Sequence, residues 1–147
     1  FPDRTAKPAM HEFKAIAAPA VIGSTKASSG QFTIFNKQFF TGIEDFDLLW
    51  SITRDGINID GGRVKLPVVG PRKTGRFTIK SAHLLKADGK GERFITFTLL
   101  RKSSTAWAPT SAEIGWNQFS LPSKANTVGK IAPLLRYFLS MAFPNRF

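Results

Sequence analysis

The sequence has no cysteine, only two histidines, ten acidic residues against 21 basic ones, and no long apolar run. Without cysteine, a disulfide framework, a thiol nucleophile and a thiolate-held zinc or iron–sulfur site are all excluded. No apolar stretch approaches the roughly 20 residues that a membrane-spanning helix needs, so we expect no membrane partner.

The chain also lacks an initiator methionine. It begins at Phe1, and its first residues show neither the basic start nor the apolar run of a secretory signal. We therefore expect a piece of a longer protein. Its 147 residues are enough for one domain, which at this size buries roughly 70% of its unfolded surface.

The scarcity of acids leaves a formal net charge of +11, most of it in the middle of the chain. Residues 63–102 contain eleven basic residues and the two acids Asp88 and Glu92. The basic ones are Arg63, Lys65, Arg72, Lys73, Arg76, Lys80, Lys86, Lys90, Arg93, Arg101 and Lys102. Such a cluster suits nucleic acid, because each basic residue on a phosphate releases counterions. The basic residues also alternate with apolar ones, as in residues 76–80, which is typical of a solvated strand face. We favour this second interpretation.

Beyond Pro19 the sequence alternates polar residues with β-branched and aromatic ones, a period typical of half-buried strands. The clearest runs are residues 31–36, 47–54, 62–66, 75–80, 93–101 and 113–121. Because Asp55-Gly56 divides residues 47–66, we expect a hairpin there, with a bulge or a second turn near Gly61. Short strands without long helices between them predict a mainly β protein, an immunoglobulin-like antiparallel β-sandwich with Trp50 as a core anchor.

The two ends of the chain depart from this pattern. Residues 9–14 predict one or two helical turns after Pro8, in a short helical or irregular N-terminal segment. Residues 134–143 are apolar with helical character, which predicts an atypical C-terminal tail too short to span a bilayer.

Few residues suggest catalysis. His11 and His83 are far apart in the chain and show no metal-ligand spacing. Glu44, Asp45 and Asp47 form the one acidic cluster that could supply a glycosidase pair, but their place before a strand favours turn and edge roles. We therefore predict a binding or structural module with no catalytic, cofactor-binding or metal-ligating residue.

Two further patterns fail in detail. Residues 89–94, GKGERF, miss the last glycine of a dinucleotide fingerprint and predict a hairpin loop. Residues 58–61, NIDG, resemble the centre of a calcium loop, but Gly56 stands where the first acid should be and the closing glutamate is missing.

Two stretches resemble a known family. Residues 3–12, DRTAKPAMHE, resemble the segment that closes the catalytic (β/α)8 barrel of bacterial β-galactosidases of glycoside hydrolase family two. Residues 32–56 and 95–121 resemble the immunoglobulin-like linker domain that follows this barrel, through the runs NKQFF, LLWSITRDG and TAWAPTSAEIGWNQF. The resemblance extends over about residues 1–122.

The resemblance implies a division of the chain and a place for the chemistry. Residues 1–23 correspond to the end of the catalytic barrel and a connection, residues 24–123 to the sandwich, and residues 124–147 to a divergent or truncated tail. The family's catalytic glutamates lie on barrel strands, upstream of Phe1, so the resemblance assigns no catalytic residue to this chain. It implies two partners, the barrel and a C-terminal sandwich domain, and leaves a homo-oligomer open.

We therefore predict a non-catalytic linker domain that positions the barrel of a β-galactosidase during hydrolysis of terminal β-galactosides. A cytoplasmic location is expected, with a periplasmic one as the alternative. The alternative function is a freestanding basic β-sandwich that binds nucleic acid or another polyanion, although nucleic acid is not the favoured partner. A third hypothesis is a sugar-binding sandwich using Trp107 and Trp116, whose places within the family motif instead favour packing roles.

Overall fold

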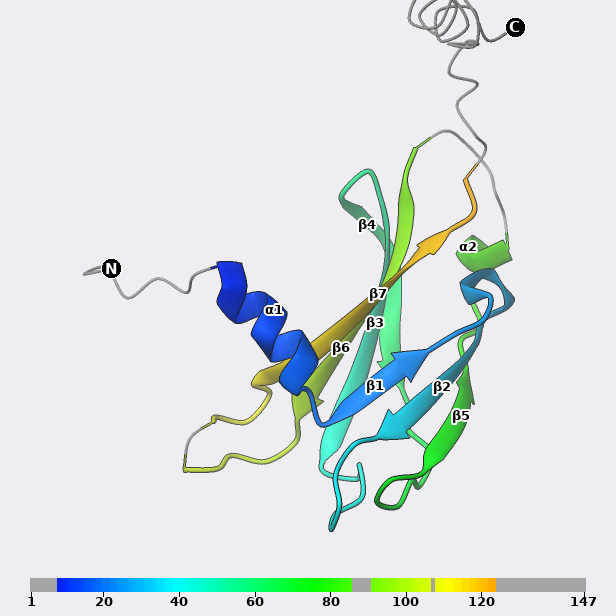
Figure 1. The fold of residues 1–147 in the computed structure, drawn as a ribbon. Coiled ribbons are helices and arrows are strands. Elements are labelled where there is room, and N and C mark those ends of the chain that lie inside the picture. The colour runs from blue at the N-terminus through cyan, green and yellow to red at the C-terminus, as the bar shows by residue number, and fades with distance from the viewer. Residues whose placement is uncertain (1–7, 86–90, 107, 124–147) are drawn as a thin grey trace, which may run out of the picture.

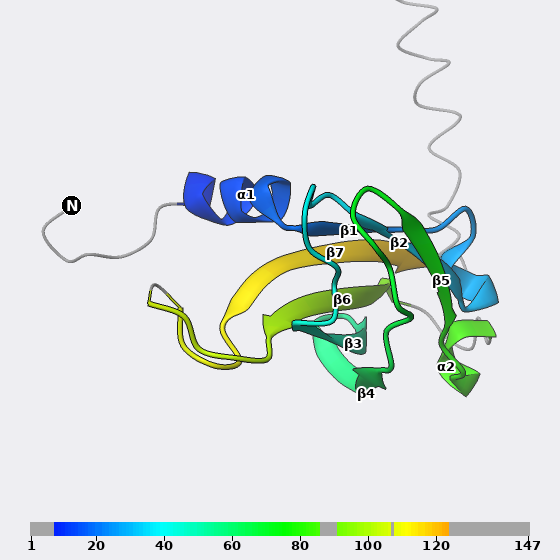
Figure 2. The ribbon, with the colours of Figure 1, turned by 90° about the horizontal axis from the view of Figure 1, so that it is seen from below.

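Two antiparallel β-sheets pack face to face in the computed structural model, which describes residues 8–85, 91–106 and 108–123 (Figures 1 and 2). One sheet has the order β1-β2-β5 and the other the order β4-β3-β6-β7. The strands are β1 (Ala20–Gly23), β2 (Gln31–Asn36), β3 (Phe46–Arg54), β4 (Ile57–Val64), β5 (Thr74–Thr78), β6 (Arg93–Arg101) and β7 (Glu113–Leu121). The helices are α1 (Pro8–Ala17), the 3-10 turn η1 (Ala27–Ser29) and α2 (Ala82–Leu85). The predicted immunoglobulin-like β-sandwich is confirmed.

Strands with clear alternation lie where the sequence predicts them. β2, β6 and β7 have the predicted bounds, and β3 begins one residue early. β4 differs most from its predicted run, residues 62–66. It starts at Ile57 and includes Gly61 and Gly62, where the sequence allowed a second turn. Pairing with β3 supplies the backbone hydrogen bonds that keep this glycine pair extended. β1 and α2 were not predicted.

The β3–β4 connection is a two-residue hairpin turn. Asp55 and Gly56 both have positive φ, 49° and 81°, and Arg54 pairs with Ile57 across the turn. This is the type I′ geometry that Asp-Gly favours, because its twist matches that of the strands. The predicted hairpin is confirmed. The register shifts between Ile52 and Thr53 and leaves Ile59 as the extra residue of β4, so the bulge lies before the glycine pair and not at it.

The core lies between the sheets, and four phenylalanines join them. Phe32 and Phe77 come from β2 and β5, whereas Phe97 and Phe119 come from β6 and β7. The rings of Phe32 and Phe97 meet edge to face with centroids 4.7 Å apart, and Phe77 meets Phe97 at 5.7 Å. These contacts hold the two sheets in one relative position.

The two sides of the sandwich differ. On one side β1 approaches β7, where the Ile22 amide donates a hydrogen bond to Asn117 Oδ1 at 3.1 Å. On the other side the edge strands β4 and β5 leave a groove. Trp50 packs against the core beside this groove but stays half-buried, because Gly62 opposite it has no side chain to cover the ring. Trp50 is thus a core contact at the edge rather than at the centre.

Helix α1 lies against β7 (Figure 2). It begins at Pro8, which suits a first helical position because the N–H that proline lacks would be unpaired there. Gly115 lets the chain after the helix approach closely, since a Cβ at this position would lie 2.4 Å from the Cβ of Ala18. Lys14 adds an ion pair with Glu113 at 3.3 Å. The predicted helix is confirmed and is longer than expected.

The predicted tail, residues 124–147, lies outside the described residues. Within the described part of the chain, no helix has the length and apolar character needed to cross a membrane.

Candidate functional site

The acidic cluster lies in a turn and at a strand start. Glu44 and Asp45 are exposed, and Asp47 on β3 pairs with Arg63 at 3.3 Å between Oδ2 and Nη1. Lys102 Nζ donates to the Glu44 backbone carbonyl at 2.6 Å, and its amide donates to the carbonyl of Asp45. The turn contacts are those that the sequence indicated. The edge role is wrong for Asp47, because β3 pairs with β4 on one side and β6 on the other.

The two histidines do not meet. His11 is part of α1, and its side chain lies outside the described residues. His83 belongs to α2, where its backbone amide donates to Ser81 Oγ at 3.2 Å. Across residues 8–85, 91–106 and 108–123, no group of three or more histidines and acids is placed to hold a metal ion.

The calcium-like run is part of a strand. Asp60 in β4 accepts the Gly61 amide at 2.8 Å through Oδ1, and its Oδ2 accepts the hydroxyl of Ser81. Both oxygens thus have protein donors. The GKGERF run lies partly outside the described residues. Its described part leads into β6, and just before that strand the Glu92 amide donates to Asp55 Oδ1 at 2.9 Å.

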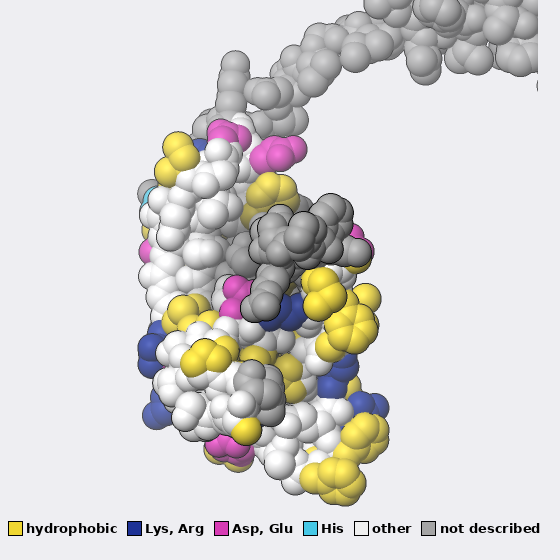
Figure 3. All heavy atoms as spheres, turned by 90° about the vertical axis from the view of Figure 1, so that its left-hand side faces the viewer, with side chains coloured by type: hydrophobic (Ala, Val, Ile, Leu, Met, Phe, Trp, Pro, Cys, Tyr) yellow, Lys and Arg dark blue, Asp and Glu magenta, His cyan; other side chains and the backbone are white. Residues whose placement is uncertain are grey.

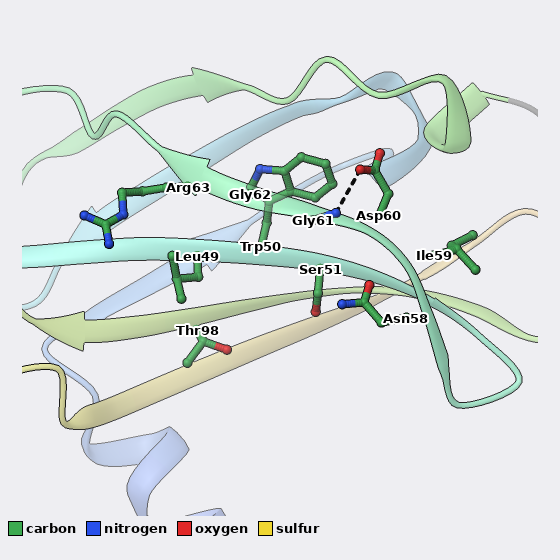
Figure 4. A pocket seen from close by; sticks show the side chains of 10 residues that line it. All are labelled: Leu49, Trp50, Ser51, Asn58, Ile59, Asp60, Gly61, Gly62, Arg63 and Thr98. Carbon is green, nitrogen blue, oxygen red and sulfur yellow. Dashed lines mark hydrogen bonds between the residues drawn. The ribbon is translucent and has the colours of Figure 1, made fainter.

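A hollow of about 750 Å³ lies along β4 (Figure 4). Two of the residues along it, Gly61 and Gly62, have no side chains. Its lining residues are Leu49, Trp50, Ser51, Asn58, Ile59, Asp60, Gly61, Gly62, Arg63 and Thr98. The Trp50 ring points to the opposite side of β3 from Leu49 and Ser51 (Figure 4). The Trp50 ring and the side chains of Leu49 and Ser51 therefore do not form one surface on which a sugar could stack.

The tryptophans of the sugar-binding hypothesis are not gathered either. Trp116 lies on β7, opposite Thr98 of β6, and is 37% exposed, so it is less buried than a packing role predicts. Trp107 lies outside the described residues.

Part of the basic cluster lines the groove between β4 and β5, an open space of about 620 Å³. Arg63, Lys65, Arg76 and Lys80 are exposed along it, over a floor that includes Trp50, Val64, Phe77 and Ile79. Other members of the cluster lie elsewhere. Arg93 is only 2% exposed and donates from Nη1 to the Pro122 carbonyl at 3.1 Å.

Two exposed apolar surfaces were missed by the sequence analysis. The first is on α1, where Met10, Phe13 and Ile16 are 59%, 66% and 71% exposed. Their spacing of three residues puts them on one helix face, and this spacing is the signal that could have revealed them. The second is the pair Phe39 and Phe40 between β2 and β3. We call these surfaces the α1 stripe and the Phe loop, the latter comprising residues 37–42.

The family model and the relatives that match this chain are all described as β-galactosidases. Residues 32–122 match a family model described as "Beta-galactosidase, domain 4". A β-galactosidase of Priestia megaterium is 30% identical over 126 residues, which is 85% of this chain and 12% of that protein. One of Arthrobacter sp. (strain B7) is 24% identical over 144 residues, 90% of this chain and 14% of that protein. "Beta-galactosidase 2" of Enterobacter cloacae is 28% identical over 123 residues, 84% of this chain and 12% of that protein. The chain spans about an eighth of the length of these relatives.

Proposed function

Since the chain belongs to the family of β-galactosidase domain 4, we propose that it is the non-catalytic linker domain of a larger β-galactosidase. In this role it holds the catalytic barrel and a later domain in fixed positions while the parent enzyme hydrolyses terminal β-galactosides. The observation that carries the proposal is the match of residues 32–122 to this domain, which extends from β2 through β7.

The packing of the sandwich supports a positioning role. Phe32, Phe77 and Phe97 interlock the two sheets, so a force on one sheet is transmitted to the other. Such stiffness matters to a distant active site, because a displacement of about 1 Å there can lower the rate about 100-fold. The exposed carboxylates of Glu44 and Asp45, and the ion pair of Asp47, are consistent with chemistry that takes place in another domain.

The α1 stripe supports the placement of a barrel next to this domain. Three large apolar side chains on one helix face are an unfavourable surface in water and are typical of a contact with another domain. The first half of α1 lies within residues 3–12, the segment that resembles the end of the barrel. The proposal therefore has the barrel bury Met10, Phe13 and Ile16.

Hydrolysis of a chromogenic β-galactoside tests the proposal. We expect no turnover by the 147-residue chain alone and turnover by the complete polypeptide encoded around it. In that polypeptide, Glu44→Gln and Asp47→Asn should leave kcat unchanged, because neither carboxylate acts on substrate in this proposal. Turnover by the chain alone that disappears on Glu44→Gln would refute it.

A basic binding module is the second candidate, favoured by the groove between β4 and β5. This groove combines four cations with Trp50, and basic and aromatic side chains together are a common means of binding single-stranded nucleic acid. Against it, Arg63 already pairs with Asp47, and basic residues on edge strands also prevent strand-to-strand aggregation.

Titration of a labelled single-stranded oligonucleotide at several salt concentrations separates the two candidates. A binding module would lose affinity steeply with salt, and Arg76→Glu in the groove would weaken binding more than Lys102→Glu outside it. We expect only the weak non-specific binding that a net charge of +11 produces at low salt, and no difference between the two variants. Tight binding that is weakened selectively by Arg76→Glu would favour the second candidate.

A further inference from the structure

The Phe loop presents two adjacent aromatic rings to solvent at one end of the sandwich. Phe39 is 68% exposed and Phe40 is 94% exposed, with ring centroids 6.5 Å apart. Figure 3 shows hydrophobic side chains gathered beside Lys and Arg side chains at the lower end of the molecule, where the β2–β3 connection lies in Figure 1. Neighbouring exposed phenylalanines are unfavourable in water and mark a surface that another molecule covers.

A buried asparagine holds the Phe loop in shape. Asn36 is 0% exposed, and its Nδ2 donates to the carbonyls of Thr41, Val69 and Gly70 at 2.8, 3.3 and 3.1 Å. Its Oδ1 accepts the Gln38 amide at 3.0 Å. One side chain thus fastens both ends of the loop to the β4–β5 connection, which reduces the freedom that the phenylalanines would lose on binding a partner.

Side chains around the loop add to this order. Gln38 Nε2 donates to the Gly42 carbonyl at 3.1 Å. The Arg72 guanidinium lies 4.9 Å from the ring centroid of Phe39, a cation–π contact, and its Nη1 donates to the Lys37 carbonyl at 3.4 Å. The exposed Phe39 ring therefore has a fixed neighbour with a positive charge.

The Phe loop is also connected to α1. Lys37 Nζ donates to the carbonyl of Ile16 at 2.6 Å, so the loop and the C-terminal end of α1 are in direct contact. Ile16 is itself a member of the α1 stripe. The Phe loop and the α1 stripe are thus linked by Lys37 and can face the same neighbour.

We propose that the Phe loop docks this domain onto the catalytic barrel of the same polypeptide, with Phe40 inserted into an apolar pocket that has a carboxylate at its rim for Arg72. This inference rests on the proposed function. Two observations favour the barrel as the occupant. The loop contacts α1, whose first residues lie in the segment that resembles the end of the barrel. This chain also covers only 12 to 14% of its relatives, so most of such a polypeptide lies outside it. Phe40 is 94% exposed, so docking can bury its whole ring, and an aromatic side chain buried in this way is a common anchor of an interface.

Hydroxyl-radical footprinting with mass spectrometry tests the docking directly. The 147-residue chain and the complete polypeptide are labelled in parallel, and the modification rates of Phe40 and Ile57 are compared. Ile57 is the matched control, because it is 71% exposed at the other end of β3. We expect the rate at Phe40 to fall about tenfold in the complete polypeptide, as for a side chain in the core of an interface, while the rate at Ile57 is unchanged.

The other outcomes distinguish a failure of the docking proposal from a failure of the proposed function. The activity of the complete polypeptide on a β-galactoside is measured in the same sample. An active enzyme in which Phe40 is modified at the isolated-chain rate, or in which Ile57 is protected equally, overturns the docking alone. A complete polypeptide without that activity, or a reading frame without a barrel, overturns the proposed function. Protection of Phe40 in the isolated chain that grows with concentration assigns the loop to a second copy of the chain instead.

A double variant gives a second measurement. Phe39→Ser/Phe40→Ser should leave the thermal unfolding midpoint of the isolated chain unchanged, because both rings are exposed there. In the complete enzyme the same variant should lower the midpoint of thermal inactivation, whereas Ile57→Ser should not. An unchanged midpoint in the complete enzyme contradicts the proposal.

Discussion

Phe97→Ala is expected to destabilise the domain by about 3 to 5 kcal/mol, the usual cost of removing a buried phenylalanine ring. Phe97 is 0% exposed and lies within 4.7 to 6.2 Å, centroid to centroid, of Phe32, Phe77 and Phe119. Its removal leaves a cavity at the point where both sheets meet. Because a domain of this size has a total stability of only about 5 to 15 kcal/mol, the loss should be evident in urea unfolding followed by tryptophan fluorescence.

The matched control for this prediction is Phe40→Ala. The same atoms are removed, but the ring is 94% exposed, so the free energy of unfolding should change by less than about 0.5 kcal/mol. Equal effects of the two substitutions on the isolated chain would contradict the assignment of Phe97 to the core and of Phe40 to the surface.

Asn36→Ala is expected to lower the free energy of unfolding by about 2 to 4 kcal/mol, since each buried polar group left without a partner costs about 1 to 3 kcal/mol. The variant loses the donors to three carbonyls, among them the buried contact with Val69. It also frees the Gln38 amide at the start of the Phe loop. Hydrogen exchange of residues 37–42 should therefore become faster than the overall loss of stability explains.

Asn36→Asp sharpens this test. It keeps the shape of the side chain but turns a carboxylate toward the carbonyl oxygens of Thr41, Val69 and Gly70. Burial and these oxygens disfavour the charged form, so the pKa of the new carboxyl is raised in the folded state. The extra destabilisation is then full at neutral pH and shrinks as the pH falls toward about 4, the usual aspartate pKa. Urea unfolding at pH 7 and pH 5 measures it, and a pH-independent difference from Asn36→Ala would contradict the predicted burial.

These two predictions concern different parts of the proposed positioning role. The aromatic core around Phe97 makes the sandwich stiff, whereas Asn36 keeps the Phe loop ready for its partner. A positioning domain needs both properties, because a stiff body without an ordered contact surface would not fix the barrel.

Much of the fold could be predicted because the signals are local. The bounds of β2, β6 and β7 follow from alternation over six to nine residues, which is set by the two-residue period of a strand. The β3–β4 turn follows from Asp55-Gly56, one of the residue pairs that readily adopt two positive φ angles. The family resemblance was also visible in the sequence, because its motifs are contiguous runs.

The candidate surfaces were harder to predict, because exposure is not a local property. Phe39 and Phe40 follow an alternating strand and could as well have continued into the core. The path of the chain at this point is held by Asn36, whose side chain donates to carbonyls more than 30 residues away, at Val69 and Gly70.

By itself, the sequence determined the strands with clear alternation, the hairpin at Asp55-Gly56 and the absence of thiol chemistry, since each depends on residue types within a short segment. Only the tertiary structure decided that Ala20–Gly23 is a strand, because its hydrogen bonds come from β2. It also decided that Gly61 and Gly62 stay extended, and that Arg63 and Arg76 share one groove. The physical reason is the same in each case: pairing and burial depend on partners that are distant in the sequence and become neighbours only when the two sheets close on their aromatic core.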